Sequence, residues 1–325
     1  MISHAIKYFN PLIGKSLEFC KAINLAMRTA NSDASILLQG ETGTGKELFV
    51  EAIHKGSKRR TTGHLVPINC AAITETLFES EIMGHEKGAF TGATEKRQGK
   101  VEYADQGTLF LDEISEMPLP MQTKFLRVLQ QKQFSPVGSN KTFESNFRII
   151  CTTNIDLKTC ITNGRFRNDL YHRINVIRIV IPPLRYRRDD ILILANHFIK
   201  KICHQQKINV KKIDEKTETY LTNYLWPGNV RELENVCKRA VTLTDSNDIC
   251  YDVLPQELTD PKCRFDLNDI QILSKAIVSN KFPIDIIKTA TIRTAYEQCG
   301  CRLKDTVKFL ENMGFSESTI KRRLK

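Results

Sequence analysis

Short apolar runs alternate with amphipathic segments through the first half of the chain. Five of the runs, among them the buried strands expected at 36–38 and 108–111, are rich in Ile, Leu, Val and Phe. They are 36–38, 65–70, 108–111, 147–154 and 176–181. Helical spacing predicts a first helix at 16–29, before the strands, with Ser16 as a candidate N-cap, and further helices at 47–54 and 121–130 between strands. Strands that alternate with helices predict an α/β fold with a parallel sheet flanked by helices.

The pattern becomes purely helical after Pro182 and Pro183. Segments 189–202, 215–225 and 229–243 have the apolar period of helices. We therefore expect an α/β subdomain at 1–182, with a hairpin over 134–143, and a helical subdomain at 183–250 packed against it. Mixed periodicity and two prolines predict a linker at 251–285.

The last segment, 286–325, has two further helical patterns separated by Gly314-Phe315-Ser316. This arrangement predicts an all-α helix-turn-helix domain. Lys and Arg outnumber Asp and Glu there, so the second helix could contact a DNA groove and its phosphates. The candidate DNA-binding residues are Ser316, Ser318, Thr319, Lys321, Arg322 and Arg323. A basic tail without this fold is the alternative.

A glycine-rich segment follows the first predicted strand and opens a helix. It reads Gly40, Glu41, Thr42, Gly43, Thr44, Gly45 and Lys46, followed by Glu47. Strand, GxxxxGK and helix in this order predict a phosphate-binding loop, in which backbone N–H groups and the helix N-terminus face the anion and Lys46 reaches the outer phosphates. A glycine-rich turn without a ligand is the alternative. Ile13 in the loop before the first helix is a further expected nucleotide contact.

Two acidic residues, Asp112 and Glu113, end the third predicted strand. Ligands bind at this edge of a parallel sheet. Glu47 stands where many phosphate loops have a hydroxyl, so magnesium would depend on phosphates, water and Asp112, while Glu113 would polarise the attacking water. A helix N-cap is the alternative for this acidic pair.

Two asparagines, Asn69 and Asn154, end the second and the fourth predicted strands. Asn69 could hydrogen-bond Glu113, although a capping or turn role is also open. Asn154 could contact the γ-phosphate or the attacking water, or it could simply terminate its strand.

Three arginines lie within 164–173, and Arg231 lies in the predicted helical subdomain. Arginine suits the spread charge of a phosphoryl group, and Arg167 and Arg173 could supply it to a neighbouring subunit. An ordinary charged helix face is the alternative. Arg231, early in a helix that follows Trp226-Pro227-Gly228-Asn229, is expected to face the nucleotide.

A glycine-bounded aromatic lies between the second and third predicted strands. The stretch is Gly88, Ala89, Phe90, Thr91, Gly92 and Ala93. Glycines inside an otherwise helical region predict a loop inserted in a helix. An exposed Phe90 at its tip is expected to anchor a contact with another protein.

The composition indicates a class of binding partner and a cellular compartment. The net charge of +11 favours nucleic acid as a partner, with a basic solvated surface as the alternative. Ten cysteines without a repeated pair spacing indicate reduced thiols. No apolar run approaches the roughly 18 residues of a membrane span, and no signal peptide opens the chain. We therefore expect a cytoplasmic protein.

Together these motifs resemble the sigma-54-dependent transcriptional activators, or bacterial enhancer-binding proteins, of the AAA+ ATPases. The resemblance covers about residues 10–245 and, more weakly, 286–325. The runs that carry it are 79–93, 166–176, 182–185 and 226–235. Glu47 after the phosphate-loop lysine is also usual in that family.

The resemblance implies an AAA+ ATPase domain with a helical lid, which forms a hexameric ring, uses ATP and Mg²⁺ and opens promoters by remodelling sigma-54 bound to RNA polymerase. It implies that Asn69 restrains Glu113 as a switch and that Asn154 is the first sensor. It makes Arg167 and Arg173 the fingers acting in trans and Arg231 the second sensor. Residues 88–93 would contact sigma-54.

The chain departs from the pattern of the sigma-54-dependent activators in two places, and two rival functions remain open. The chain starts almost directly with the ATPase domain, so we expect constitutive activity or control by a separate regulatory protein. Residues 310–315 insert extra positions where the first helix of a Fis-type DNA-binding domain ends, which weakens the prediction of enhancer DNA binding. The rivals are a DNA-binding regulator independent of sigma-54 and a AAA+ remodeller with another substrate. The intact residues 88–93 argue against both.

Overall fold

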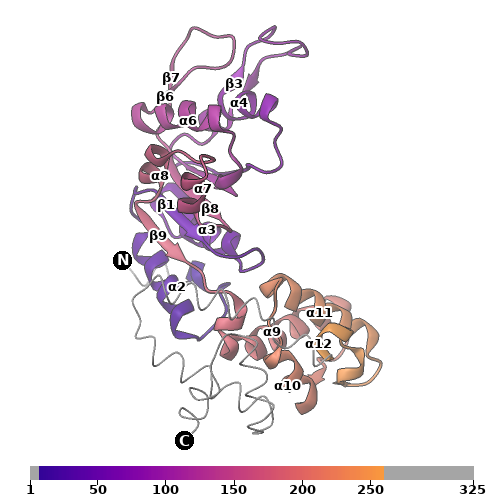
Figure 1. The fold of residues 1–325 in the computed structure, drawn as a ribbon. Coiled ribbons are helices and arrows are strands. Elements are labelled where there is room, and N and C mark those ends of the chain that lie inside the picture. The colour runs from indigo at the N-terminus through magenta and orange to yellow at the C-terminus, as the bar shows by residue number, and fades with distance from the viewer. Residues whose placement is uncertain (1–6, 260–325) are drawn as a thin grey trace, which may run out of the picture. The chain divides into compact units, whose positions relative to one another are not determined.

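Five parallel strands form the central sheet, in the order β2-β5-β8-β1-β9 (Figure 1). They are β2 (Leu65–Asn69), β5 (Thr108–Asp112), β8 (Arg148–Thr153), β1 (Ile36–Gln39) and β9 (Ile177–Val180). All neighbouring pairs are parallel, which confirms the predicted sheet. The computed structural model describes residues 7–259. The predicted helix-turn-helix at 286–325 and most of the predicted linker lie outside these residues.

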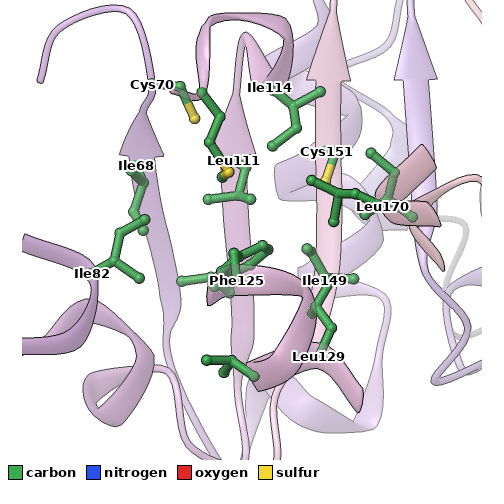
Figure 2. Packing of buried hydrophobic residues seen from close by; sticks show 14 of the residues in the cluster. Ile68, Cys70, Ile82, Leu111, Ile114, Phe125, Leu129, Ile149, Cys151 and Leu170 are labelled. Atoms are coloured by element: carbon green, nitrogen blue, oxygen red, sulfur yellow. The ribbon is translucent and has the colours of Figure 1, made fainter. Parts of the chain in front are cut away.

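Helices cover both faces of the sheet, as the alternating pattern predicts. On one face, α2 (Leu17–Thr29) and α3 (Lys46–Lys55) pack through a core that includes Phe49 and Leu38. The opposite face is covered by α4 (Glu75–Met83), α6 (Leu119–Gln131), α7 (Leu157–Thr162) and α8 (Asn168–Ile174). Figure 2 shows Phe125 of α6 against the strands that carry Leu111 and Ile149.

The register of the strands gathers their carboxyl ends at one edge. Asn69 pairs with Asp112 in the β2–β5 register. Gly40, the first residue after β1, donates its N–H to the carbonyl of Thr153 at 3.1 Å. The phosphate loop, the acidic pair and the end of β8 therefore lie together, although they are far apart in sequence.

A loop interrupts the helical region between α4 and α5 (Lys100–Tyr103), as predicted. Two short antiparallel strands, β3 (Gly84–His85) and β4 (Arg97–Gln98), close the base of this loop. The predicted hairpin is also present, as β6 (Gln133–Phe134) and β7 (Phe143–Glu144). Val137 in the hairpin exchanges backbone hydrogen bonds with Gly84 and Glu86, so the two loops are joined at their bases.

The lid consists mainly of α9 (Arg188–Gln206), α10 (Glu215–Asn223) and α11 (Asn229–Leu243). Short elements accompany them: η3 (Leu184–Tyr186), β10 (Lys212–Ile213), β11 (Asp248–Ile249), η4 (Tyr251–Val253) and α12 (Gln256–Thr259). Leu254 and Leu258 are buried in the same core as Trp226. The lid therefore continues past residue 250, where the sequence places the linker, because its last elements are too short to show a clear period.

The start of α2 is held by the lid. Ser16 occupies the N-cap position, but its side chain makes no capping bond within α2. Its hydroxyl donates instead to Asp190 Oδ2 at 2.8 Å, and the N–H groups of Lys15 and Ser16 donate to Asp190 Oδ1. Asp190 is fully buried in α9, so this contact fixes the loop that precedes α2.

Candidate functional site

A pocket of about 710 Å³ lies between the phosphate loop and the lid. The predicted nucleotide contacts among its lining residues are Ile13, Thr42, Gly43, Thr44, Gly45, Lys46, Glu47, Asn69, Asp112, Glu113 and Arg231. The structure therefore brings together residues from the loop before α2, from three strand ends and from α11. An apolar wall, formed in part by Leu194 and Phe198 of α9, completes the pocket.

Lys46 is buried at the first turn of α3, where the chain leaves the phosphate loop. Its Nζ donates to the carbonyls of Gly40 at 2.8 Å and Glu41 at 3.1 Å. Burial lowers the pKa of Lys46, while the carboxylates of Asp112 and Glu113 oppose that shift. A helix N-terminus and a buried ammonium group together make this end of the pocket suited to phosphate.

One hydroxyl links the two acidic residues at the end of β5. Thr152 Oγ1 of β8 donates to Asp112 Oδ1 and accepts the N–H of Glu113 at 3.2 Å. Glu113 has a left-handed backbone, with φ of +52°, which is a strained conformation for a residue with a side chain. Both carboxylates line the pocket, so the pair is placed for metal binding and for polarising water.

The two asparagines at strand ends make local contacts. Asn69 Oδ1 accepts the N–H of Ala71 at 3.0 Å, which is the turn role that the sequence left open. Among the described residues, no hydrogen bond joins Asn69 to Glu113, so the switch remains a prediction. Asn154 Nδ2 lies 3.4 Å from Thr42 Oγ1, at the edge of the phosphate loop.

Arg167 and Arg173 lie outside the pocket lining of their own chain. The Arg167 guanidinium forms a two-pronged contact with Asp169, whose carboxylate raises the pKa of Arg167. Arg173 Nη2 donates to the carbonyl of Leu129 at 3.1 Å. Both side chains are exposed on or beside α8, as residues acting on a neighbouring subunit would have to be.

Glu41 does not line the pocket, although the sequence places it among the nucleotide contacts. Its carboxylate accepts two hydrogen bonds from Arg185, at 2.8 and 2.5 Å, and one from Asn229 at 3.1 Å. These contacts tie the phosphate loop to the lid. Gly40 also lies outside the lining, but its carbonyl accepts from Lys46.

Arg187 lines the pocket and was not identified from the sequence. Its guanidinium lies 4.3 Å from the centroid of the Phe19 ring, and burial lowers its pKa to about 10. Arg231 and Glu47, in contrast, are exposed, with 4.0 Å between Nη2 and Oε1. The sequence feature that could have identified Arg187 as a pocket residue is its position two residues after the Pro182-Pro183-Leu184-Arg185 run.

Phe90 lies on the loop closed by β3 and β4. It is 38% exposed, and its ring packs edge to face on His85. The structure therefore places Phe90 at the surface of this loop, and its contact with another protein stays a prediction. His85 itself is buried and pairs with Ser80 Oγ through Nδ1 at 2.7 Å.

Asp112 is the predicted magnesium ligand among the residues that line the pocket. Within residues 7–259, no three His, Cys, Asp or Glu side chains gather closely enough to hold a metal. Magnesium commonly takes one or two carboxylates and completes its shell with phosphates and water. Asp112 fits that requirement.

Among residues 7–259, no helix combines the length and apolar character that a bilayer crossing requires.

The phosphate loop, the acidic strand end and the helical lid define the fold and site of the AAA+ P-loop ATPases. Residues 185–265 match the family described as the AAA+ ATPase lid domain. Residues 12–180 match the Sigma-54 interaction domain. The chain belongs to this sigma-54 activator family.

Similar proteins include transcriptional regulators. The chain is 47% identical to the regulatory protein AtoC of Escherichia coli over 76% of this chain and 53% of AtoC. It is 40% identical to the regulatory protein LuxO of Vibrio parahaemolyticus over 97% of this chain and 69% of LuxO. The chain spans about half the length of AtoC and of the phenol regulator MopR of Acinetobacter guillouiae. A crystal structure of NtrX from Brucella abortus in complex with ATP has a TM-score of 0.73 and 32% identity, over 96% of this chain and 68% of that one.

Proposed function

We propose that the protein is an ATP-hydrolysing transcriptional activator that remodels RNA polymerase bearing sigma-54. The observation that carries this proposal is the presence, in one chain, of a nucleotide-type pocket and an intact loop that exposes Phe90. Membership of the sigma-54 activator family supports the same function, and a related structure was solved with ATP.

In the proposed reaction, Lys46 binds the outer phosphates of ATP and Asp112 holds Mg²⁺ through water. Glu113 draws a proton from the attacking water, while Asn69 restrains Glu113 until the nucleotide is correctly placed. Asn154 senses the γ-phosphate and Arg231 senses the nucleotide from the lid. Such a site works by positioning and by stabilising charge on the transferring phosphoryl group.

The proposed assembly is a hexameric ring in the cytoplasm. Arg167 and Arg173 act on the nucleotide of the neighbouring subunit, which explains why a contact with their own pocket is not needed. Residues 88–93 engage sigma-54. Residues 286–325 bind enhancer DNA through the predicted second helix, and a separate protein sets the activity.

The first test mixes the purified full chain with sigma-54 and ADP–aluminium fluoride, and looks for a complex by size-exclusion chromatography. We expect a complex with the wild type and none with Lys46→Ala or Thr91→Ala. Thr219→Ala, an exposed threonine of α10, is the matched control and should bind as the wild type does. Absence of a complex from wild-type protein that hydrolyses ATP would refute the sigma-54 function and favour a ring ATPase with another target.

A further inference from the structure

Backbone carbonyls of the phosphate loop accept hydrogen bonds from Asn229, Val230 and Arg187, at or near the start of lid helices α11 and α9. The carbonyl of Thr42 accepts from Asn229 Nδ2 at 3.1 Å, and that of Gly43 accepts the N–H of Val230 at 3.0 Å. The carbonyl of Thr44 accepts from Arg187 at 3.4 Å. Three consecutive carbonyls are thus fixed by residues that the sequence places at least 140 positions away.

These contacts bear on the N–H groups that phosphate needs. In a planar trans peptide, the carbonyl and the following N–H point in opposite directions. Because the carbonyls of Thr42 and Thr44 are bonded to Asn229 and Arg187, the N–H groups of Gly43 and Gly45 point away from these two donors. The lid thereby helps to set the loop in the form that receives an anion.

Asn229 is central to this arrangement. It is fully buried at the start of α11 and has a φ of +54°. Its Oδ1 accepts the N–H of Leu184 at 2.8 Å, while Nδ2 serves both the Thr42 carbonyl and Glu41 Oε2. Both ends of the amide are used, and a buried polar group left without a partner is costly. The contact therefore depends on an amide in this orientation.

Glu41 and Arg185 reinforce the contact. The paired hydrogen bonds from Arg185 hold the pKa of Glu41 below its usual value, so the carboxylate stays ionised. Charge-assisted, two-pronged pairs of this kind fix geometry as well as supply energy. The carboxylate thus joins the phosphate loop to η3 and α11 at once.

Gly43 leaves no space between the loop and the lid. A Cβ at this position would lie 2.3 Å from the carbonyl oxygen of Gly228, and the φ of Gly43 is +80°. The turn before α11 therefore lies directly on the loop backbone, and a small shift of this turn must move the loop.

We propose that Asn229 is a positioning residue for ATP binding, which holds the phosphate loop ready through Thr42 and Glu41. Asn229 lies outside the pocket lining, so it acts through the loop and not on the nucleotide. The inference rests on the proposed ATPase function and extends it. According to this inference, the lid contributes to the phosphate site through Asn229 as well as through its predicted sensor, Arg231.

The test uses the full chain and changes the Asn229 amide and the Glu41 carboxylate, which face each other. Asn229→Asp keeps the acceptor for Leu184, removes the donor to the Thr42 carbonyl and sets a second carboxylate against Glu41. We expect it to weaken binding of a fluorescent ATP analogue by about tenfold and to raise KM more than it lowers kcat, because a loop poorly set for phosphate weakens ground-state and transition-state binding alike. Glu41→Gln/Asn229→Asp lacks the repulsion between two carboxylates but still lacks the donor to the Thr42 carbonyl, so it should bind the analogue more tightly than Asn229→Asp and more weakly than Glu41→Gln alone.

Two controls separate this role from a structural one. Asn196→Asp makes the same change at an exposed position of α9 and should bind the analogue as the wild type does. Thermal melting identifies folded variants, since simple loss of folded protein would lower kcat without raising KM. The inference is overturned if folded Asn229→Asp binds normally, or if the double variant binds as tightly as Glu41→Gln alone although the donor to Thr42 is missing. A wild-type chain that binds no ATP analogue would refute the proposed function itself, and this inference with it.

Discussion

The Phe90 ring packs edge to face on the His85 ring, with 5.0 Å between their centroids. His85 is in turn fixed by Ser80 near the end of α4, where Nδ1 and Oγ lie 2.7 Å apart. The exposed residue of the loop is therefore connected to the helix beneath it by a defined pair of contacts.

Loss of the His85 ring should weaken sigma-54 engagement and leave ATP turnover intact. An edge-to-face pair contributes a modest energy, so we expect His85→Ala to reduce complex formation with ADP–aluminium fluoride by roughly threefold to tenfold. The measurement is a titration of sigma-54 beside an ATPase assay. Ser80→Ala, which keeps the ring, should have a smaller effect. Equal loss of both activities would show that His85 supports the fold instead of the contact.

Arg148 should be important for stability because its buried guanidinium closes the end of α2. Its Nη1 and Nη2 donate to the carbonyls of Ala30 and Thr29, each at 2.7 Å, and burial lowers its pKa to about 10. Arg148→Met removes both bonds and should lower the free energy of unfolding by about 2–4 kcal/mol, measured by urea denaturation. Arg178→Met, at an exposed site of β9, should cost less than about 0.5 kcal/mol. Similar losses at the two sites would contradict the capping role.

His54 should make stability depend on pH in the mildly acidic range. Burial lowers its pKa below the ordinary 6.5, helped by the positive charge of Arg148. The unfolded chain then binds the proton more readily, so this part of the stability is present above pH 6.5 and is lost as pH falls through and below that value. Melting temperatures of the wild type and His54→Gln between pH 7.5 and 5 should converge as pH falls. His204→Gln, at an exposed position of α9, is the matched control for loss of a histidine side chain.

Mixed rings should test whether the arginines act between subunits. Arg173→Ala and Glu113→Gln should each abolish ATPase activity, because one loses the finger and the other the base. In a mixture of equal parts, a pocket with intact Glu113 can meet a neighbour with intact Arg173, and about a quarter of the wild-type activity should return if subunits assemble at random in a ring. The measurement is steady-state phosphate release. No recovery, from variants shown to assemble together, would indicate that Arg173 acts within its own chain.

Much of the fold could be predicted because it is encoded locally. The runs of β1, β5 and β8 are those of strands buried on both faces, whereas the edge strands β2 and β9 alternate buried and exposed side chains. The glycines and Lys46 identify the phosphate loop, and the strand end identifies Asp112 and Glu113. These signals come from residues that are adjacent in the sequence.

The contacts between the loop and the lid could not be predicted, since they join distant segments. Glu41 looks like part of the phosphate motif, and only the fold shows that Arg185 and Asn229 take its carboxylate. Arg187 likewise becomes a pocket residue because α9 begins beside the phosphate loop. Spatial proximity of this kind leaves no periodic trace in the sequence.

The shared hydroxyl of Thr152 has a consequence for remote substitutions. β8 carries Thr152 against both acidic residues and leads directly into Asn154 beside Thr42, so one strand sets the alignment of the two sides of the pocket. Cys151, on the opposite face of β8, is buried in the core that Figure 2 shows. A larger residue at 151 could thus tilt the strand and misalign both sides at once. Such a defect would be mistaken for damage to the chemistry although its origin is mechanical.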